Sequence, residues 1–102
     1  MEVVYETPKF EVTDLLRDAG YERMWTEVVE EPLDHMSPSR RESTRQRFGH
    51  IENLYSVRAA AETRPGYSSP SKTSRIIGGD MNDAVAAAHS MAEELRCATA
   101  AP

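Results

Sequence analysis

The sequence is poor in the features that mark several common protein classes. It has a single cysteine, Cys97, so no disulfide can form within the chain and the fold depends on packing alone. No stretch approaches the roughly 18 apolar residues of a membrane-spanning helix, and the start Met-Glu-Val-Val-Tyr-Glu lacks the pattern of a signal peptide. We therefore expect a cytoplasmic protein, found in the host cell or virion-associated if the chain is viral, with no membrane partner.

Apolar residues are also scarce, at 39% of 102 residues. A chain of this length buries roughly 60 to 65% of the surface of its unfolded state, so its core is small. We expect a single small domain over residues 1–97, with a polar Arg-rich segment at 37–47 and a frayed tail at 98–102.

Charged side chains are abundant and sorted into blocks. Residues 1–34 hold ten acidic against three basic side chains, a net charge of −7, whereas residues 35–75 hold eight basic against three acidic ones, a net charge of +5. Residues 76–102 return to −3. Such separation of charge indicates a partner that is attracted to either the acidic or the basic block, because charge asymmetry governs the rate of association and the choice of partner.

Local patterns predict an α+β fold with a small antiparallel sheet of three or four strands packed against two helices. Residues rich in β-branched and aromatic side chains predict strands at 1–6, 24–31 and 74–77, with a second helix as the alternative for 24–31. Thr13 is a suitable N-cap for a short helix over 14–19. Asp80 is a suitable cap for an alanine-rich C-terminal helix over about 81–97, whose apolar residues form one stripe.

The segment from Phe48 to Arg64 fits two structures. With a period of two residues, Tyr55, Val57 and Ala59 lie on one face of a half-buried strand. With a period of 3.6 residues, Phe48, Ile51 and Tyr55 share one stripe of a helix. The second interpretation leads to an alternative all-α fold with a long central helix over about 38–64.

With the strand interpretation, the order from Thr13 onward is helix, strand, strand, strand, helix. This order, with Gly49-His50 before the strand that contains Tyr55-Ser56-Val57-Arg58 and an alanine-rich last helix, resembles the double-stranded-RNA-binding domain over residues 13–96. The resemblance implies that the start of the last helix grips phosphates. In this chain that place reads Gly79-Asp80-Met81-Asn82-Asp83, which repels phosphates, so the RNA-binding role is not carried over.

The segment 37–47 is the main candidate for a binding site, because it contains four arginines and no large apolar side chain. It is a solvated loop, the polar start of a helix, or an arm that orders on a partner. Guanidinium groups suit carboxylate or phosphate partners, and nearby apolar residues would supply buried anchors. The predicted partner-binding residues are Arg40, Arg41, Arg45, Arg47, Phe48, Ile51 and Tyr55. The alternative is a solvated surface that balances the acidic N-terminal third.

An acidic face is the second candidate. If its carboxylates line one exposed surface, they would mimic a phosphate backbone and occupy a nucleic-acid channel of another protein. Its members are Glu22, Glu27, Glu30, Glu31 and Asp34. An ordinary solubilising surface explains the same residues.

Catalytic and metal-binding patterns are missing from the sequence. The soft metal ligands His35, His50, His89 and Cys97 lack the paired spacing of a zinc site, and no serine or cysteine lies in a nucleophile motif. We therefore expect no enzyme activity, no cofactor and no metal.

These features lead to two functional hypotheses. The first is a non-enzymatic protein-binding accessory protein, such as a small viral or phage-type inhibitor of a host machine or a subunit of a larger assembly, whose partner is another protein or a second copy of the chain. The alternative is a nucleic-acid-binding regulator that uses the arginine cluster at 40–47.

Overall fold

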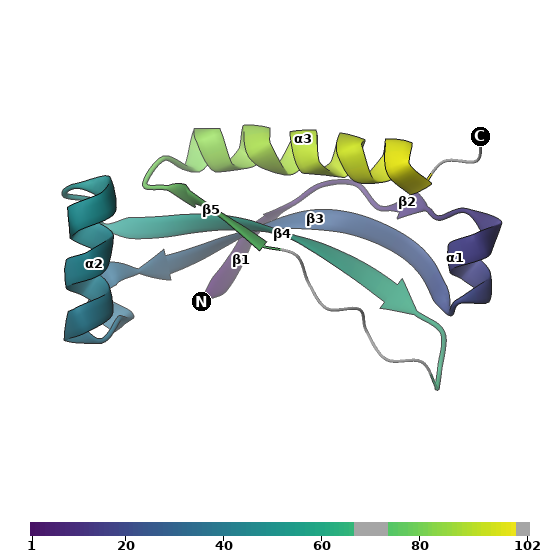
Figure 1. Ribbon diagram of the computed structural model, residues 1–102, viewed down its shortest axis with the longest axis horizontal. Coiled ribbons are helices and arrows are strands. Elements are labelled where there is room, and N and C mark those ends of the chain that lie inside the picture. Colours follow the sequence, from purple (N-terminus) through teal and green to yellow (C-terminus); the bar gives the residue numbers. More distant parts are fainter. Residues whose placement is uncertain (67–73, 100–102) are drawn as a thin grey trace.

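The protein folds around one antiparallel sheet. The computed structural model describes residues 1–66 and 74–99. The strands β1 (Glu2–Glu6), β3 (Tyr21–Pro32), β4 (Asn53–Thr63) and β5 (Ser74–Gly78) lie in the order β1-β3-β4-β5, and the two-residue strand β2 (Phe10–Glu11) pairs with β3 beside β1 (Figure 1). The α+β class is therefore confirmed, with five strands in the described part of the chain instead of three or four.

Strands β3 and β4 form the long centre of the sheet. They pair from Tyr21 opposite Thr63 to Pro32 opposite Asn53. Val28 lies directly opposite Val57, and both side chains are fully buried. Cross-strand pairs of β-branched side chains pack well on a pleated surface. This packing explains why the segment from Asn53 to Thr63 forms a strand and not a helix.

The main core lies between the sheet and the helix α3 (Met81–Thr99), which runs along one face (Figure 1). Ala84 and Ala88 are fully buried against Val28 and Val57, and Tyr55 and Met91 complete this cluster. Small alanine side chains allow the helix axis to approach the strands closely. The predicted C-terminal helix is confirmed and extends two residues further than expected, so of the predicted tail at 98–102 only residues 100–102 lie outside the described part.

Helix α2 (Pro38–Phe48) occupies most of the Arg-rich segment. The Ser37 side chain accepts a hydrogen bond from the Arg40 backbone N–H, Pro38 is the first helical residue, and Gly49 follows the last turn with a φ of 80°. Both ends therefore carry ordinary helix signals. The alternative all-α fold with a central helix over 38–64 is wrong, because the helix ends at Phe48 and β4 begins at Asn53.

Helix α2 lies at one end of the sheet and the short helix α1 (Asp14–Asp18) at the other (Figure 1). A second small core, made of Leu33, Met36 and Leu54 with Phe48 and Ile51, joins α2 and the 3-10 helix η1 (Leu33–His35) to the sheet. The order helix, strand, strand, strand, helix from Thr13 onward is present, with α2 inserted after the first of these strands. The described chain thus has three α-helices where two were predicted, and none is long and apolar enough to cross a membrane.

Candidate functional site

The oppositely charged blocks of the sequence meet inside the fold. Arg40 donates two hydrogen bonds to the Glu31 carboxylate, at 2.9 and 2.8 Å. The Nε of Arg58 lies 3.0 Å from the carboxylate of Glu27, which is only 6% exposed. The hydrogen bond from Arg40 lowers the pKa of Glu31 below its ordinary value. Some of the oppositely charged side chains therefore pair with each other within the chain, and these charges are not available to a partner.

The four arginines of α2 have different environments. The Arg41 guanidinium donates to the backbone carbonyl oxygens of Leu33 at 3.0 Å and Met36 at 3.2 Å, which fastens α2 to η1. Arg45 and Arg47 are exposed, and neither lies within ion-pair distance of a carboxylate in the described part of the chain. The Arg47 guanidinium lies 4.9 Å from the centre of the Phe48 ring. Arg45 and Arg47 are therefore the members of this cluster that remain available.

The predicted apolar anchors contribute to the interior. Phe48 and Ile51 are half-buried against the small core at α2. Tyr55 is 8% exposed in the main core, and its hydroxyl donates to the Glu30 carboxylate at 2.9 Å. This hydrogen bond raises the pKa of Tyr55. Contact of these residues with a partner stays a prediction.

The predicted acidic residues do not line one exposed face. Glu27 is buried with Arg58, and Glu30 and Glu31 are neighbours on β3, so their side chains point to opposite faces of the sheet. The other two, Glu22 and Asp34, are exposed near opposite ends of β3. Mimicry of a phosphate backbone therefore lacks the row of exposed carboxylates on which that hypothesis depended.

A groove between α2 and β5, called the α2–β5 groove below, brings free charge and apolar surface together. Its volume is about 300 Å³, and it is lined by Ser39, Arg40, Ser43, Thr44, Arg47, Phe48, Leu54 and Ile76. Ser39, Ser43 and Arg47 follow one another at intervals of four residues, so they share a helix face. Ile76 is 47% exposed. The groove thus has a polar wall with an available guanidinium and an apolar floor.

Sequence reasoning missed the two serines and Ile76. The sequence from Ser37-Pro38 to Gly49 contains an N-cap, a proline at the first helical position and a glycine after the last turn, which together predict α2. Recognition of that helix would have placed Ser39, Ser43 and Arg47 on one face. The position of Ile76 beside them depends on the pairing of β5 with β4, which no local pattern indicates.

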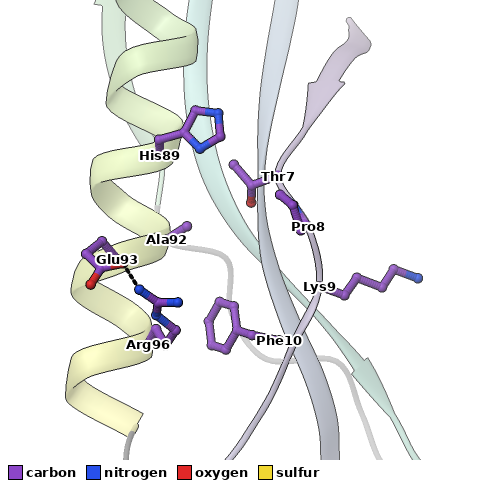
Figure 2. Close-up of a pocket in the computed structure, with 8 residues that line it drawn as sticks. All are labelled: Thr7, Pro8, Lys9, Phe10, His89, Ala92, Glu93 and Arg96. Carbon is purple, nitrogen blue, oxygen red and sulfur yellow. Dashed lines mark hydrogen bonds and ion pairs between the residues drawn. The ribbon is translucent and has the colours of Figure 1, made fainter.

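A second groove lies between α3 and the segment that joins β1 to β2 (Figure 2). Its volume is about 230 Å³, and its charged and polar groups already have partners. The Arg96 guanidinium forms an ion pair with Glu93, and the His89 Nε2 lies 2.6 Å from the Tyr5 hydroxyl. Lys9 points away from α3 and forms an ion pair with Glu62. The α2–β5 groove is therefore the better candidate for binding a charged partner.

Two further observations bear on the site. In residues 1–66 and 74–99, no three His, Cys, Asp or Glu side chains come together in a group that could hold a metal ion. Comparisons with protein-family models, curated proteins and solved structures find no match to this chain. The similarity of its element order to the double-stranded-RNA-binding domain therefore has no support from a related structure.

Proposed function

We propose that the protein is a non-enzymatic protein-binding accessory domain that docks an acidic segment of another protein in the α2–β5 groove. One observation carries the proposal: Arg47 is exposed at this groove without a carboxylate partner in the described part of the chain, beside the apolar side chains of Phe48, Leu54 and Ile76. A carboxylate of the partner would complete the pairing that the described part of the chain leaves open.

The chemistry of the groove fits a segment that combines carboxylates with apolar side chains. A guanidinium binds a carboxylate through two parallel hydrogen bonds, and the hydroxyls of Ser39 and Ser43 offer further donors on the same wall. Burial of an apolar side chain against Ile76 would remove exposed apolar surface from water. Duplex nucleic acid fits this floor less well, because its backbone offers phosphates but no apolar side chains.

The helix itself supports a role in docking. Helix α2 contains no fully buried residue: Arg41, Thr44 and Phe48 are half-buried toward the small core, and its other side chains are exposed. Apart from Phe48 the helix is polar on all sides, which is typical of elements that bridge between packed units. We infer that its exposed face meets the partner, which is consistent with a small inhibitor of a larger machine or a subunit of an assembly.

The test compares the double variant Arg45→Ala/Arg47→Ala with a control, Arg23→Ala, which removes an exposed arginine from β3. Each protein is used to capture partners from cells that naturally contain it, and captured proteins are quantified by mass spectrometry. The affinity of the purified partner is then measured by calorimetry. We expect the double variant to weaken binding at least about tenfold, because a hydrogen bond to a charged group contributes roughly 1.5 to 3 kcal/mol. Arg23→Ala should bind as the wild type does, and equal binding by all three proteins would refute the proposal.

A salt titration separates this proposal from the nucleic-acid alternative. Arg40 and Arg41 are engaged within the chain, which leaves Arg45 and Arg47 as the available cations of the 40–47 cluster. We expect no binding to a labelled duplex of DNA or RNA at physiological salt. Binding that falls steeply as salt rises, and that the double variant abolishes, would replace the present proposal with a nucleic-acid-binding regulator.

A further inference from the structure

The two outer strands of the sheet, β1 and β5, flank the same stretch of the two central strands. Strand β1 pairs with the part of β3 from Glu27 to Glu30, and β5 pairs with the part of β4 from Tyr55 to Arg58. Those two parts are themselves opposite each other, since Glu27 faces Arg58 and Glu30 faces Tyr55. At this level the sheet is four strands wide, and each edge presents backbone groups that another strand can pair with.

The directions of these strands allow the sheet to continue from one copy to the next. Each of the three pairings from β1 through β3 and β4 to β5 is antiparallel, so β1 and β5 have opposite sense in the sheet, and the twist of the sheet turns one against the other (Figure 1). A second copy displaced sideways, and rotated about that direction to follow the twist of the sheet, would therefore place its β1 antiparallel to the β5 of the first. We propose that copies of this chain associate head to tail, with the β5 edge of one copy paired with the β1 edge of the next.

The exposed side chains of the two edges are complementary. Val3 is 36% and Ile76 47% exposed, and both lie on the face opposite α3, because Val3 faces Val29 and Ile76 faces Ser56. In a shared sheet, Val3 and Ile76 would lie side by side and cover each other. This contact would bury exposed apolar surface of both edge strands, and at Ile76 it would compete with the segment docked in the α2–β5 groove.

The charged side chains Glu2 and Arg75 of the two edges are complementary as well, on the face that α3 covers. Glu2 faces Glu30 and Arg75 faces Val57, so both point to the side of α3. With Val3 opposite Ile76, Glu2 and Arg75 become diagonal neighbours, a separation of about 7 to 8 Å that long side chains span. Arg75 has no carboxylate within ion-pair distance in the described part of the chain. The neighbouring copy would provide that carboxylate.

Pairing of two β1 edges is less favourable. In an antiparallel pair centred on Val4, Glu2 of each copy would lie opposite Glu6 of the other, and like charges directly opposite each other destabilise a sheet. The head-to-tail contact avoids this repulsion. Such a contact uses different surfaces on the two copies, so it continues into a chain of copies unless a ring closes.

No described helix blocks either edge. Figure 1 looks down the shortest axis and shows α1 and α2 at the two ends of the sheet and α3 above one face. The extent along that axis is 18 Å. Four strands at a spacing of about 4.8 Å advance by about 19 Å per copy, so the repeat accommodates the thickness of the molecule.

Analytical ultracentrifugation from micromolar to millimolar concentration tests the association. We expect the wild type to form a concentration-dependent series of multiples of the 11.4 kDa chain. Val3→Lys and Ile76→Lys should each lose every species above the monomer, because a charged side chain on an edge strand blocks pairing. The matched control Leu15→Lys changes an 80% exposed leucine on α1 in the same way and should associate as the wild type does. Circular dichroism verifies that each variant is folded.

Mixing the two edge variants gives the decisive result. Val3→Lys keeps its β5 edge and Ile76→Lys keeps its β1 edge, so an equimolar mixture should form a 1:1 dimer although each variant alone is monomeric. A wild type that stays monomeric at all concentrations, self-association of Val3→Lys through two β5 edges, or the lack of a mixed dimer would each overturn the proposal. Arg45→Ala/Arg47→Ala should leave this association unchanged, so failure here is distinguishable from failure of the proposed docking function.

Discussion

A chain of hydrogen bonds through Thr26 ties α3 to the sheet, and its removal should measurably weaken the fold. Thr26 is fully buried, and its hydroxyl donates to the backbone carbonyl oxygen of Ala88 at 2.7 Å. The Thr7 Oγ1 lies 2.9 Å from the Thr26 Oγ1 and accepts a hydrogen bond from the Thr26 backbone N–H, also at 2.9 Å. Because the only hydroxyl hydrogen of Thr26 goes to Ala88, Thr7 must be the donor between the two hydroxyls.

The substitution Thr26→Val keeps the shape of the side chain and removes its hydroxyl. Thr7 is then left with a longer bond, 3.3 Å, to the Thr26 carbonyl oxygen, and Ala88 loses its side-chain donor. A buried group that loses its partner costs about 1 to 3 kcal/mol, so we expect the free energy of unfolding to fall by about 2 kcal/mol. In a domain of this size that corresponds to a decrease in Tm on the order of 10 °C.

Urea unfolding, followed by circular dichroism and by the fluorescence of Trp25, measures this change. The slope of the unfolding free energy against urea should stay constant, because the surface exposed on unfolding is nearly unchanged. Thr26→Ser is the control: it keeps the hydroxyl, loses one methyl group, and should cost about 1 kcal/mol. Thr7→Val combined with Thr26→Val should cost less than the two single changes added together, by at least about 0.5 kcal/mol. Wild-type stability in Thr26→Val, or strict additivity, would refute the reasoning.

Two further predictions concern packing and pH. In Gly79→Ala the new Cβ would overlap the Ile51 side chain, whose own Cβ is 2.9 Å away, so we expect a loss of about 1 to 3 kcal/mol in thermal unfolding; a variant as stable as the wild type would contradict this packing. The hydrogen bond from Arg40 lowers the pKa of Glu31 below its ordinary 4.5, so the folded state takes up this proton less readily than the unfolded chain. The resulting stabilisation is present above that value and disappears as pH falls through the lowered pKa. Glu31→Gln should therefore reduce the dependence of unfolding free energy on pH in acid, and an unchanged profile would show that the pair contributes nothing.

Local sequence signals predicted the elements whose formation depends on neighbouring residues. The Asp80 cap and the alanine-rich stripe identified α3, and the Asp80 side chain indeed accepts a hydrogen bond from the Asn82 backbone N–H at 2.8 Å. The β-branched residues around Val28 identified β3. The segment after Phe48 was open between helix and strand, because its alanines favour a helix while its period of two favours a strand. The segment forms a strand because β4 pairs with β3 over its whole length.

The candidate site was only partly predictable. The arginine cluster was found, but the distinction between engaged and available arginines was not. Arg40 meets Glu31 and Arg41 meets backbone carbonyls of η1 because α2 folds back beside the end of β3. The amino-acid order does not reveal these contacts. Ile76 was expected only as part of a short strand, and it becomes a binding candidate through the exposed position of β5 at the edge of the sheet.

By itself, the sequence determined the C-terminal helix and the presence of separated charge blocks and favoured the α+β class over an all-α fold, because helix caps, periodicity and composition act over a few residues. Only the tertiary structure decided which charges cancel, since pairs such as Glu27 with Arg58 depend on the register of strands that lie 31 residues apart. Strand register is set by which side chains of β3 and β4, such as Val28, Tyr55 and Val57, are buried against α3, and this is a property of the folded chain and of no local segment.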